Sequence, residues 1–193
     1  MNDAPPVTVL PHVPFWYLRH GETDWNAQGL SQGSVDIPLN PVGIAQAKAA
    51  ALMLRNRGIA TIVSSPLGRA RMTAETVGEA LDLPVQIDQD LREVSWGVQE
   101  GKAMSDWFTG WVEGTFTPDR AESFAHLRQR GAAALGRALA HPPAVLVVAH
   151  GALFRALRAA MGVEPNMRTR NAAPMWCEPP APGQTAWSIR YAT

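Results

Sequence analysis

The sequence has little that would support a disulfide-bonded, zinc-binding or membrane-spanning protein. Its single cysteine, Cys177, cannot form an intrachain disulfide or a cysteine-rich zinc site. No uninterrupted apolar stretch is long enough to span a bilayer. The first fourteen residues contain four prolines and lack the basic segment and long apolar run of a secretory signal. We therefore expect a cytoplasmic protein that does not bind membranes.

The chain also lacks net charge. Its 17 basic and 17 acidic residues balance to zero, which argues against a nucleic-acid partner, because such partners select a basic excess. Fifteen of the basic residues are arginines. Guanidinium groups suit phosphate binding, although genome composition alone also produces such a bias. A length of 193 residues with 46% apolar residues fits one globular domain over residues 1–193. Nothing in the sequence assigns an oligomeric state.

Short apolar runs alternate with segments rich in alanine and leucine. The runs predict buried strands at 15–18, 59–63 and 144–149, with one or two further strands between 171 and 192. The segments between them predict helices at 41–57, 66–81, 121–140 and 151–161. Residues 1–14 are expected to form an extended arm. Such alternation predicts an α/β fold, a three-layer sandwich with a mainly parallel central sheet and helices on both faces.

Cationic or cationisable side chains follow each of the three predicted strands. Arg19 and His20 follow the first, Arg69 lies in the first turn of the helix after the second, and His150 follows the third. A lone histidine is usually structural, but two His-Gly strand ends in one chain make coincidence less plausible. Ligands of α/β sheets bind beyond the carboxyl ends of the strands. The pattern therefore predicts a site for an anion, where imidazole can attack phosphorus and guanidinium can neutralise phosphate oxygens.

Two further assignments are weaker on physical grounds alone. Arg71 lies about 200° around the helix from Arg69, so we expect it on the surface. Glu93 is one of many carboxylates, and Glu22 and Glu100 compete with it for the role of a catalytic acid.

The segment from Leu18 to Thr23, followed by Trp25-Asn26 and Gln32-Gly33, resembles the opening of the histidine phosphatase (phosphoglycerate mutase-like) superfamily. Four further segments resemble later motifs of that family in the same order: Ser64–Leu67 with Arg69, Leu91–Gly101, Glu122-Ser123, and Val147–Gly151 with Arg155. Two departures, Gln99 before Glu-Gly and Ala121 in place of glycine, lie outside the implied chemistry. Together, the motifs cover roughly residues 15 to 171 and are specific as a set.

The resemblance implies a role for each candidate residue. His20 is the implied nucleophile and Glu93 the implied proton donor. The implied phosphate pocket consists of Arg19, Arg69 and His150, with secondary contacts from Asn26, Gln32 and Gly33. The implied activity is hydrolysis of small organic phosphate esters through a phosphohistidine, with neither a metal nor another cofactor. Sugar phosphates, phosphoglycerate, nucleotides and α-ribazole phosphate all stay open as substrates.

Two other functions compete with this prediction. A cofactor-dependent phosphoglycerate mutase would use the same site, but such mutases carry a longer insertion between Glu93 and Glu122. Here the two residues are 29 positions apart, so water should reach the intermediate. A noncatalytic phosphate-binding protein is the second alternative, and the presence of the whole candidate set argues against it.

The segment at about 102–120 is expected to form a small cap. Met104, Trp107, Phe108 and Trp111 have the spacing of one helical stripe. The stripe could pack on the core, as aromatic stripes usually do. Alternatively, Trp107 and Trp111 could wall the pocket and favour esters with an apolar body over phosphoglycerates.

Overall fold

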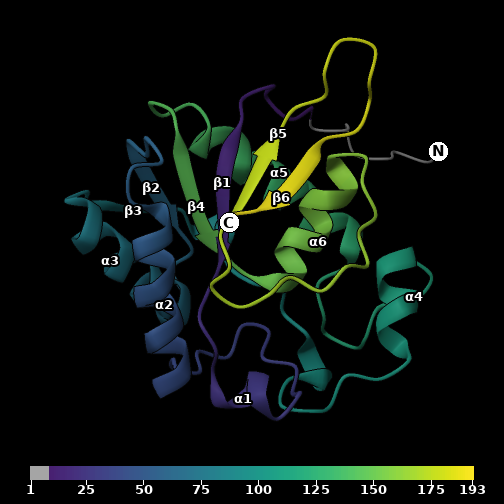
Figure 1. The fold of residues 1–193 in the computed structure, drawn as a ribbon. Helices are drawn as coiled ribbons and strands as arrows, with labels where there is room; N and C mark the ends of the chain where they lie inside the picture. Colours follow the sequence, from purple (N-terminus) through teal and green to yellow (C-terminus); the bar gives the residue numbers. More distant parts are fainter. Residues whose placement is uncertain (1–8) are drawn as a thin grey trace.

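The computed structural model describes residues 9–193, which form one mixed six-stranded sheet with helices around it (Figure 1). The strands are β1 (Phe15–Arg19), β2 (Thr61–Ser64), β3 (Val85–Ile87), β4 (Val145–Ala149), β5 (Met175–Glu178) and β6 (Ser188–Tyr191). Their order in the sheet is β3-β2-β4-β1-β5-β6. The first four strands in this order, β3, β2, β4 and β1, pair in parallel. β5 pairs antiparallel with both of its neighbours, β1 and β6. The predicted α/β fold with a mainly parallel sheet is thus confirmed.

Six α-helices and two 3-10 turns connect the strands. The helices are α1 (Asp24–Ala27), α2 (Pro41–Leu54), α3 (Gly68–Leu81), α4 (Trp107–Glu113), α5 (Phe124–Ala138) and α6 (Gly151–Ala160), and the turns lie at Gln89–Leu91 and Gly97–Gln99. The expected helix at 41–57 ends three residues early, because Asn56 and Gly58 adopt left-handed φ angles of 61° and 68°. The expected helix at 121–140 begins at Phe124, because the Ser123 hydroxyl caps it by accepting from the His126 N–H.

The strand side chains alternate between two buried clusters. Phe15 and Tyr17 of β1 join a cluster with residues of α5 and α6, whereas Trp16 and Leu18 join a cluster with residues of α2 and α3. A strand buried on both faces reads as a continuous apolar run, which is why β1 and β4 were visible in the sequence. The helices therefore cover both faces of the sheet, as predicted.

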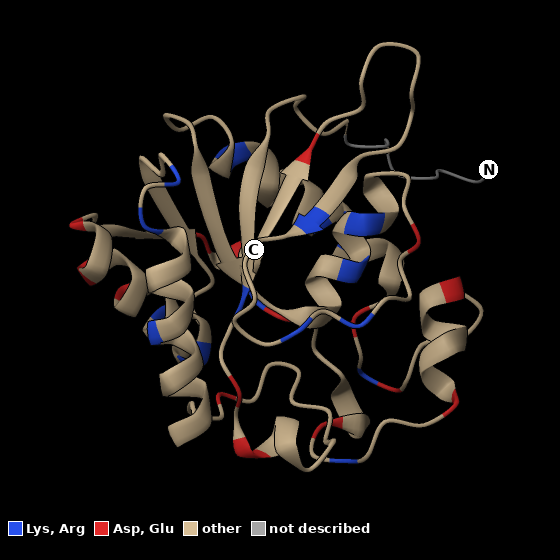
Figure 2. Cartoon of the chain, in the orientation of Figure 1, with Lys and Arg blue, Asp and Glu red and all other residues tan. Residues whose placement is uncertain are grey.

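The carboxyl ends of the parallel strands meet at one edge of the sheet. Arg19 pairs with Ala149, and the ladder continues as the His20 N–H donates to the Ala149 carbonyl at 3.0 Å. On the other side of β4, the Ser65 N–H donates to the Val148 carbonyl at 3.0 Å. This register places the residues after β1, β2 and β4 next to one another. Figure 2 shows basic segments beside these strand ends and along the loop after α6.

The predicted N-terminal arm is only partly described. Residues 1–8 lie outside the described part of the chain. Within residues 9–14, Leu10 is buried in the core and the His12 ring meets the Trp187 ring edge-on. Within residues 9–193, no helix has both the length and the apolar character needed to cross a membrane.

Candidate active site

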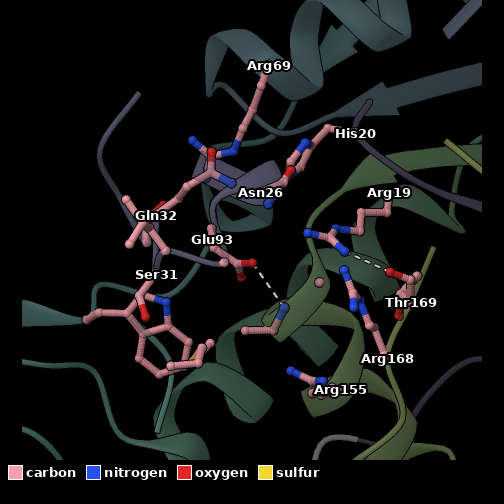
Figure 3. Close-up of a pocket in the computed structure, with 17 residues that line it drawn as sticks. Arg19, His20, Asn26, Ser31, Gln32, Arg69, Glu93, Arg155, Arg168 and Thr169 are labelled. Carbon is pink, nitrogen blue, oxygen red and sulfur yellow. Dashed lines mark hydrogen bonds between the residues drawn. The ribbon is translucent and has the colours of Figure 1, made fainter. Parts of the chain in front are cut away.

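A pocket of about 310 Å³ opens at the carboxyl edge of the parallel strands (Figure 3). Most of the predicted site residues line it: Arg19, His20, Asn26, Gln32, Gly33, Arg69 and Glu93. His150 lies directly behind this lining, with its ring centroid 5.3 Å from that of His20. The three strand ends thus converge on one cavity, as the sequence predicted.

The geometry of His20 leaves one ring nitrogen free to react. The side chain is 2% exposed, and Nδ1 lies 2.6 Å from the Gly21 carbonyl oxygen. A carbonyl only accepts, so Nδ1 carries the proton and Nε2 keeps its lone pair. Burial, together with the charges of Arg69 and Arg19, lowers the pKa of His20 well below 6.5. The ring is therefore neutral at physiological pH, as a nucleophile must be.

His150 is held in place by two buried contacts. The Tyr17 hydroxyl donates to its carbonyl oxygen at 2.8 Å, and its Nε2 lies 2.6 Å from the Ser65 hydroxyl. That hydroxyl also accepts from the Leu67 N–H at 3.3 Å, so its own proton is available to Nε2. This arrangement assigns the imidazole proton to Nδ1, which has no hydrogen-bond partner within residues 9–193. Burial, followed by the charge of Arg69, lowers the pKa of His150 well below 6.5.

Arg19 and Arg69 each use part of their guanidinium to fix their position. Arg19 Nη1 donates to the Thr169 carbonyl at 2.7 Å. Arg69 donates to the carbonyls of Val35 and Gly33, at 2.7 and 2.8 Å. Burial is the main cause that lowers the pKa of Arg19 to about 10, so this group is still protonated at neutral pH.

Several buried donors around the pocket have no partner in the described chain. They include Arg19 Nε, Arg69 Nε and His150 Nδ1. An unpaired buried donor is costly, so a cluster of them indicates a bound ligand with several acceptor oxygens. A phosphoryl group presents such oxygens together with negative charge.

Glu93 lies at the pocket with its carboxylate bound to the start of α6. Its oxygens accept from the N–H groups of Ala152 and Leu153 at 3.0 and 2.9 Å, and from Val94 at 3.1 Å. Figure 3 marks the bond to Ala152, and the side chain is 8% exposed. The contact links the candidate acid directly to the helix that follows His150.

The competing acids Glu22 and Glu100 have structural contacts elsewhere. Glu22 accepts from the Asn40 side chain at 3.1 Å, and Glu100 accepts from the N–H and hydroxyl of Ser34 at 2.9 and 2.7 Å. Neither lines the pocket. Arg71 is exposed and pairs with Glu75 at 3.4 Å, which confirms its predicted surface position.

The residues expected to make secondary contacts, Asn26, Gln32 and Gly33, lie in the segment after β1 that contains α1 and the loop that follows it. The amide oxygen of Asn26 accepts from the Asn171 side chain at 3.0 Å, and Gln32 is 7% exposed. Gly33 has a φ of 56°, and a Cβ there would lie 2.8 Å from the Trp96 ring. Glycine is therefore required for this loop to reach Arg69.

Trp107 and Trp111 do not line the pocket. Trp111 is fully buried and its indole N–H donates to the Glu122 carbonyl at 2.9 Å. Trp107 meets the Trp96 ring edge-on at 5.1 Å. The aromatic stripe thus packs on the core, the first of its two interpretations, and Trp107 and Trp111 do not wall the pocket. Met104 and Trp96 line the pocket instead.

Sequence reasoning missed two basic residues of the pocket, Arg155 and Arg168. Arg155 belonged to the last matched motif but carried no assigned role. Arg168 precedes β5 in a loop with no helical or strand period that could have indicated its direction. No cluster of residues that could hold a metal ion occurs in the described range.

Comparisons with known proteins agree with this geometry. A family model described as histidine phosphatase superfamily (branch 1) matches residues 15–175. The chain is 37% identical over 173 residues to the probable phosphoglycerate mutase GpmB of Yersinia pestis, covering 81% of this chain and 80% of that protein.

Two solved structures share the fold. A mycobacterial glucosyl-3-phosphoglycerate phosphatase, solved with VO3, is 30% identical with a TM-score of 0.81, over 92% of this chain and 97% of that one. A putative alpha-ribazole-5'-P phosphatase of Escherichia coli is 25% identical with a TM-score of 0.78, over 95% and 97%.

An α/β sheet that brings a histidine and two arginines to one anion pocket is typical of enzymes that act on phosphate esters. This chain belongs to the histidine phosphatase superfamily, as its motifs predicted.

Proposed function

We propose that the protein hydrolyses small organic phosphate monoesters through a phosphohistidine on Nε2 of His20. The observation that carries the proposal is the arrangement around that atom. Its lone pair is free, because Nδ1 is bound to the Gly21 carbonyl, and unpartnered donors of Arg19 and Arg69 lie in the same pocket. This combination supplies a nucleophile and the positive charge that phosphoryl transfer requires.

In the first step, His20 Nε2 attacks phosphorus in line and the bond to the ester oxygen breaks. The departing oxygen takes a proton from the Glu93 carboxyl group, so the product alcohol leaves neutral. Arg19, Arg69 and the Nδ1–H of His150 stabilise the charge on the three remaining phosphoryl oxygens.

In the second step, water attacks phosphorus and the nitrogen–phosphorus bond breaks. The Glu93 carboxylate takes the proton from that water and returns to its starting state. His20 leaves as the neutral imidazole, and inorganic phosphate is released. In this account, arginine side chains supply the positive charge, so the reaction needs no metal ion.

The phosphoglycerate mutase alternative is favoured by the similarity to GpmB of Yersinia pestis. Against it, the chain between Glu93 and Ser123 contains only one short α-helix, α4, of seven residues. A small cap leaves the phosphohistidine open to water, which favours hydrolysis over return of the phosphoryl group. The presence of the candidate nucleophile, both arginines and the candidate acid in one pocket argues against a noncatalytic binding role. A cytoplasmic location stays a prediction.

Product analysis separates these functions. The protein should release inorganic phosphate from a panel of phosphomonoesters, including sugar phosphates, nucleotides and α-ribazole phosphate. Interconversion of 2- and 3-phosphoglycerate faster than phosphate release would favour the mutase, and binding without turnover across the panel would favour the noncatalytic role.

A further inference from the structure

The proposed acid, Glu93, lies on a stretch of chain without regular secondary structure. Residues 93–96 belong to no helix or strand. The carboxylate is bound to the N–H groups of Ala152 and Leu153. A carboxyl group that is ready to donate its proton is neutral, and hydrogen bonds to a neutral carboxyl lack charge assistance. The geometry of proton transfer therefore depends on what fixes the backbone of Glu93.

The guanidinium of Arg130, on α5, binds this backbone. Its Nη1 donates to the carbonyl of Asp90 at 2.6 Å and to that of Arg92 at 2.9 Å. The Arg92 carbonyl belongs to the peptide group that leads into Glu93. Arg130 is buried and does not line the pocket. Its side chain thus contacts the Glu93 segment from outside the pocket.

Glu122 fixes the orientation of Arg130 and adds a second contact to the segment. Its carboxylate accepts from Arg130 Nε and Nη2 at 2.9 and 2.6 Å, the bidentate arrangement that fixes the plane of a guanidinium. The backbone N–H of Glu122 donates to the carbonyl of Ser95 at 2.9 Å. Arg130 and Glu122 therefore hold the chain on both sides of Glu93.

Net stability is a weak explanation for this pair. The cost of removing two opposite charges from water largely offsets their attraction, so apolar side chains of similar volume are often equally stabilising. What the pair supplies is direction, because the guanidinium that Glu122 orients presents a further N–H pair to the two carbonyls before Glu93. Within the motif Glu122-Ser123, the serine caps α5, whereas the mechanism above gives the glutamate no role.

We propose that Arg130, oriented by Glu122, is a positioning residue that keeps the Glu93 carboxyl group within reach of the leaving oxygen. The proposal rests on the proposed phosphatase function and deepens it. Within residues 9–193, no hydrogen bond of Arg130 or Glu122 goes to His20 or to the arginines that hold the phosphate. Disturbing the pair should therefore slow esters whose leaving group needs a proton, and spare an ester whose leaving group needs none.

Two conservative variants test this role. Arg130→Lys keeps the positive charge, but an ammonium cannot hold Glu122 in two parallel bonds and both carbonyls at once. Glu122→Gln keeps the size of the side chain and removes its charge. Each should lower kcat/KM on glycerol 2-phosphate by about 10-fold or more, since a misplacement of roughly 1 Å can cost about 100-fold. On p-nitrophenyl phosphate, kcat/KM should stay within about 2-fold of the wild-type value, because that leaving group departs without a proton.

Arg137→Gln is the matched control. Arg137 lies about two turns after Arg130 on α5 and pairs with the carboxylates of Asp88 and Asp90, at 2.8 and 2.9 Å. It also ties α5 to the chain before Glu93, but it is exposed and binds side chains, not the carbonyls beside the acid. It should keep the wild-type ratio of kcat/KM between the two esters, whatever its effect on Tm.

A double-variant comparison shows whether Arg130 and Glu122 act through Glu93. In Glu93→Gln the proton donor is already lost, so its position no longer matters. Adding Arg130→Lys or Glu122→Gln to that variant should change kcat/KM on glycerol 2-phosphate by less than about 2-fold, a clear departure from additivity.

Each outcome bears on one claim. A wild-type protein that hydrolyses no ester of the panel overturns the proposed function itself. Equal losses on the two esters, an unchanged ratio in both variants, or a full additional loss in the Glu93→Gln background overturns the positioning role while the phosphatase function stands. A ratio shifted as far by Arg137→Gln overturns it as well. If Arg130→Lys does not fold, Glu122→Gln decides the question alone.

Discussion

Replacing Glu93 by glutamine separates its two roles, because the same carboxylate holds α6 and faces the pocket. Its oxygens accept three backbone N–H bonds, from Val94, Ala152 and Leu153. In Glu93→Gln, the amide NH2 faces the Ala152 N–H, donor against donor, and both donors are left without a partner in a buried position. An unsatisfied buried polar group costs ~1–3 kcal/mol, so we expect the unfolding free energy to fall by ~3 kcal/mol. In a chain of this size that lowers Tm by roughly 6–12 °C.

The catalytic role predicts a second, selective effect. An alkyl phosphate such as glycerol 2-phosphate needs proton donation to its leaving oxygen, and loss of a general acid costs ~10²–10⁴ in kcat. The p-nitrophenolate group leaves without a proton, so the loss on p-nitrophenyl phosphate should be much smaller. The assay compares kcat on both substrates well below the Tm of the variant.

Glu100→Gln provides the matched control for this experiment. Glu100 also accepts three hydrogen bonds, from the N–H and hydroxyl of Ser34 and the N–H of Trp96, but it does not line the pocket. It should lower Tm without discriminating between leaving groups. Equal losses of Glu93→Gln on both substrates would refute the proton-donor assignment and leave Glu93 as an anchor of α6.

Three further perturbations test the phosphate site. Arg69→Ala should lower kcat/KM for every substrate by ~10²–10³, because a donor to the developing charge is lost, whereas Arg71→Ala on the exposed face of α3 should keep wild-type values. Excess EDTA should leave activity intact, and a loss restored by Mg²⁺ or Zn²⁺ would contradict the mechanism. His20 and His150 titrate near 6.5 when unfolded but well below it when folded, mainly through burial. The unfolded chain therefore binds more protons below pH 6.5, and the unfolding free energy should fall there by about 1.4 kcal/mol per pH unit for each histidine. A denaturant midpoint that stays constant from pH 6.5 to 5.5 would oppose this assignment.

The sequence predicted the parts of the fold and site that local patterns determine. β1 and β4 are apolar on both faces because helices cover both, so they read as continuous runs. Parallel pairing brings the ends of these strands together, which is why Arg19, His20 and His150 could be placed near one another. The antiparallel pairing of β5 with β1 and with β6 was not predicted, because it depends on pairing across the sheet edge.

The sequence did not determine in which direction the side chains of loops and short helices point. The stripe in α4 is compatible with either the core or the pocket, and only the Trp111 N–H bond to the Glu122 carbonyl fixes it in the core. The position of Arg168 depends on how the loop after α6 returns to the sheet, and no period in the sequence encodes that path.

The most direct test of the central claim is covalent trapping on His20. Brief mixing of wild-type protein with a radiolabelled phosphomonoester, followed by denaturation, should give a protein-bound label that is acid-labile and alkali-stable, as a phosphoramidate is. Peptide mapping should place it on His20, and His20→Ala should show neither label nor turnover. A label that persists in His20→Ala, or one with the acid stability of a phosphoserine, would contradict the account.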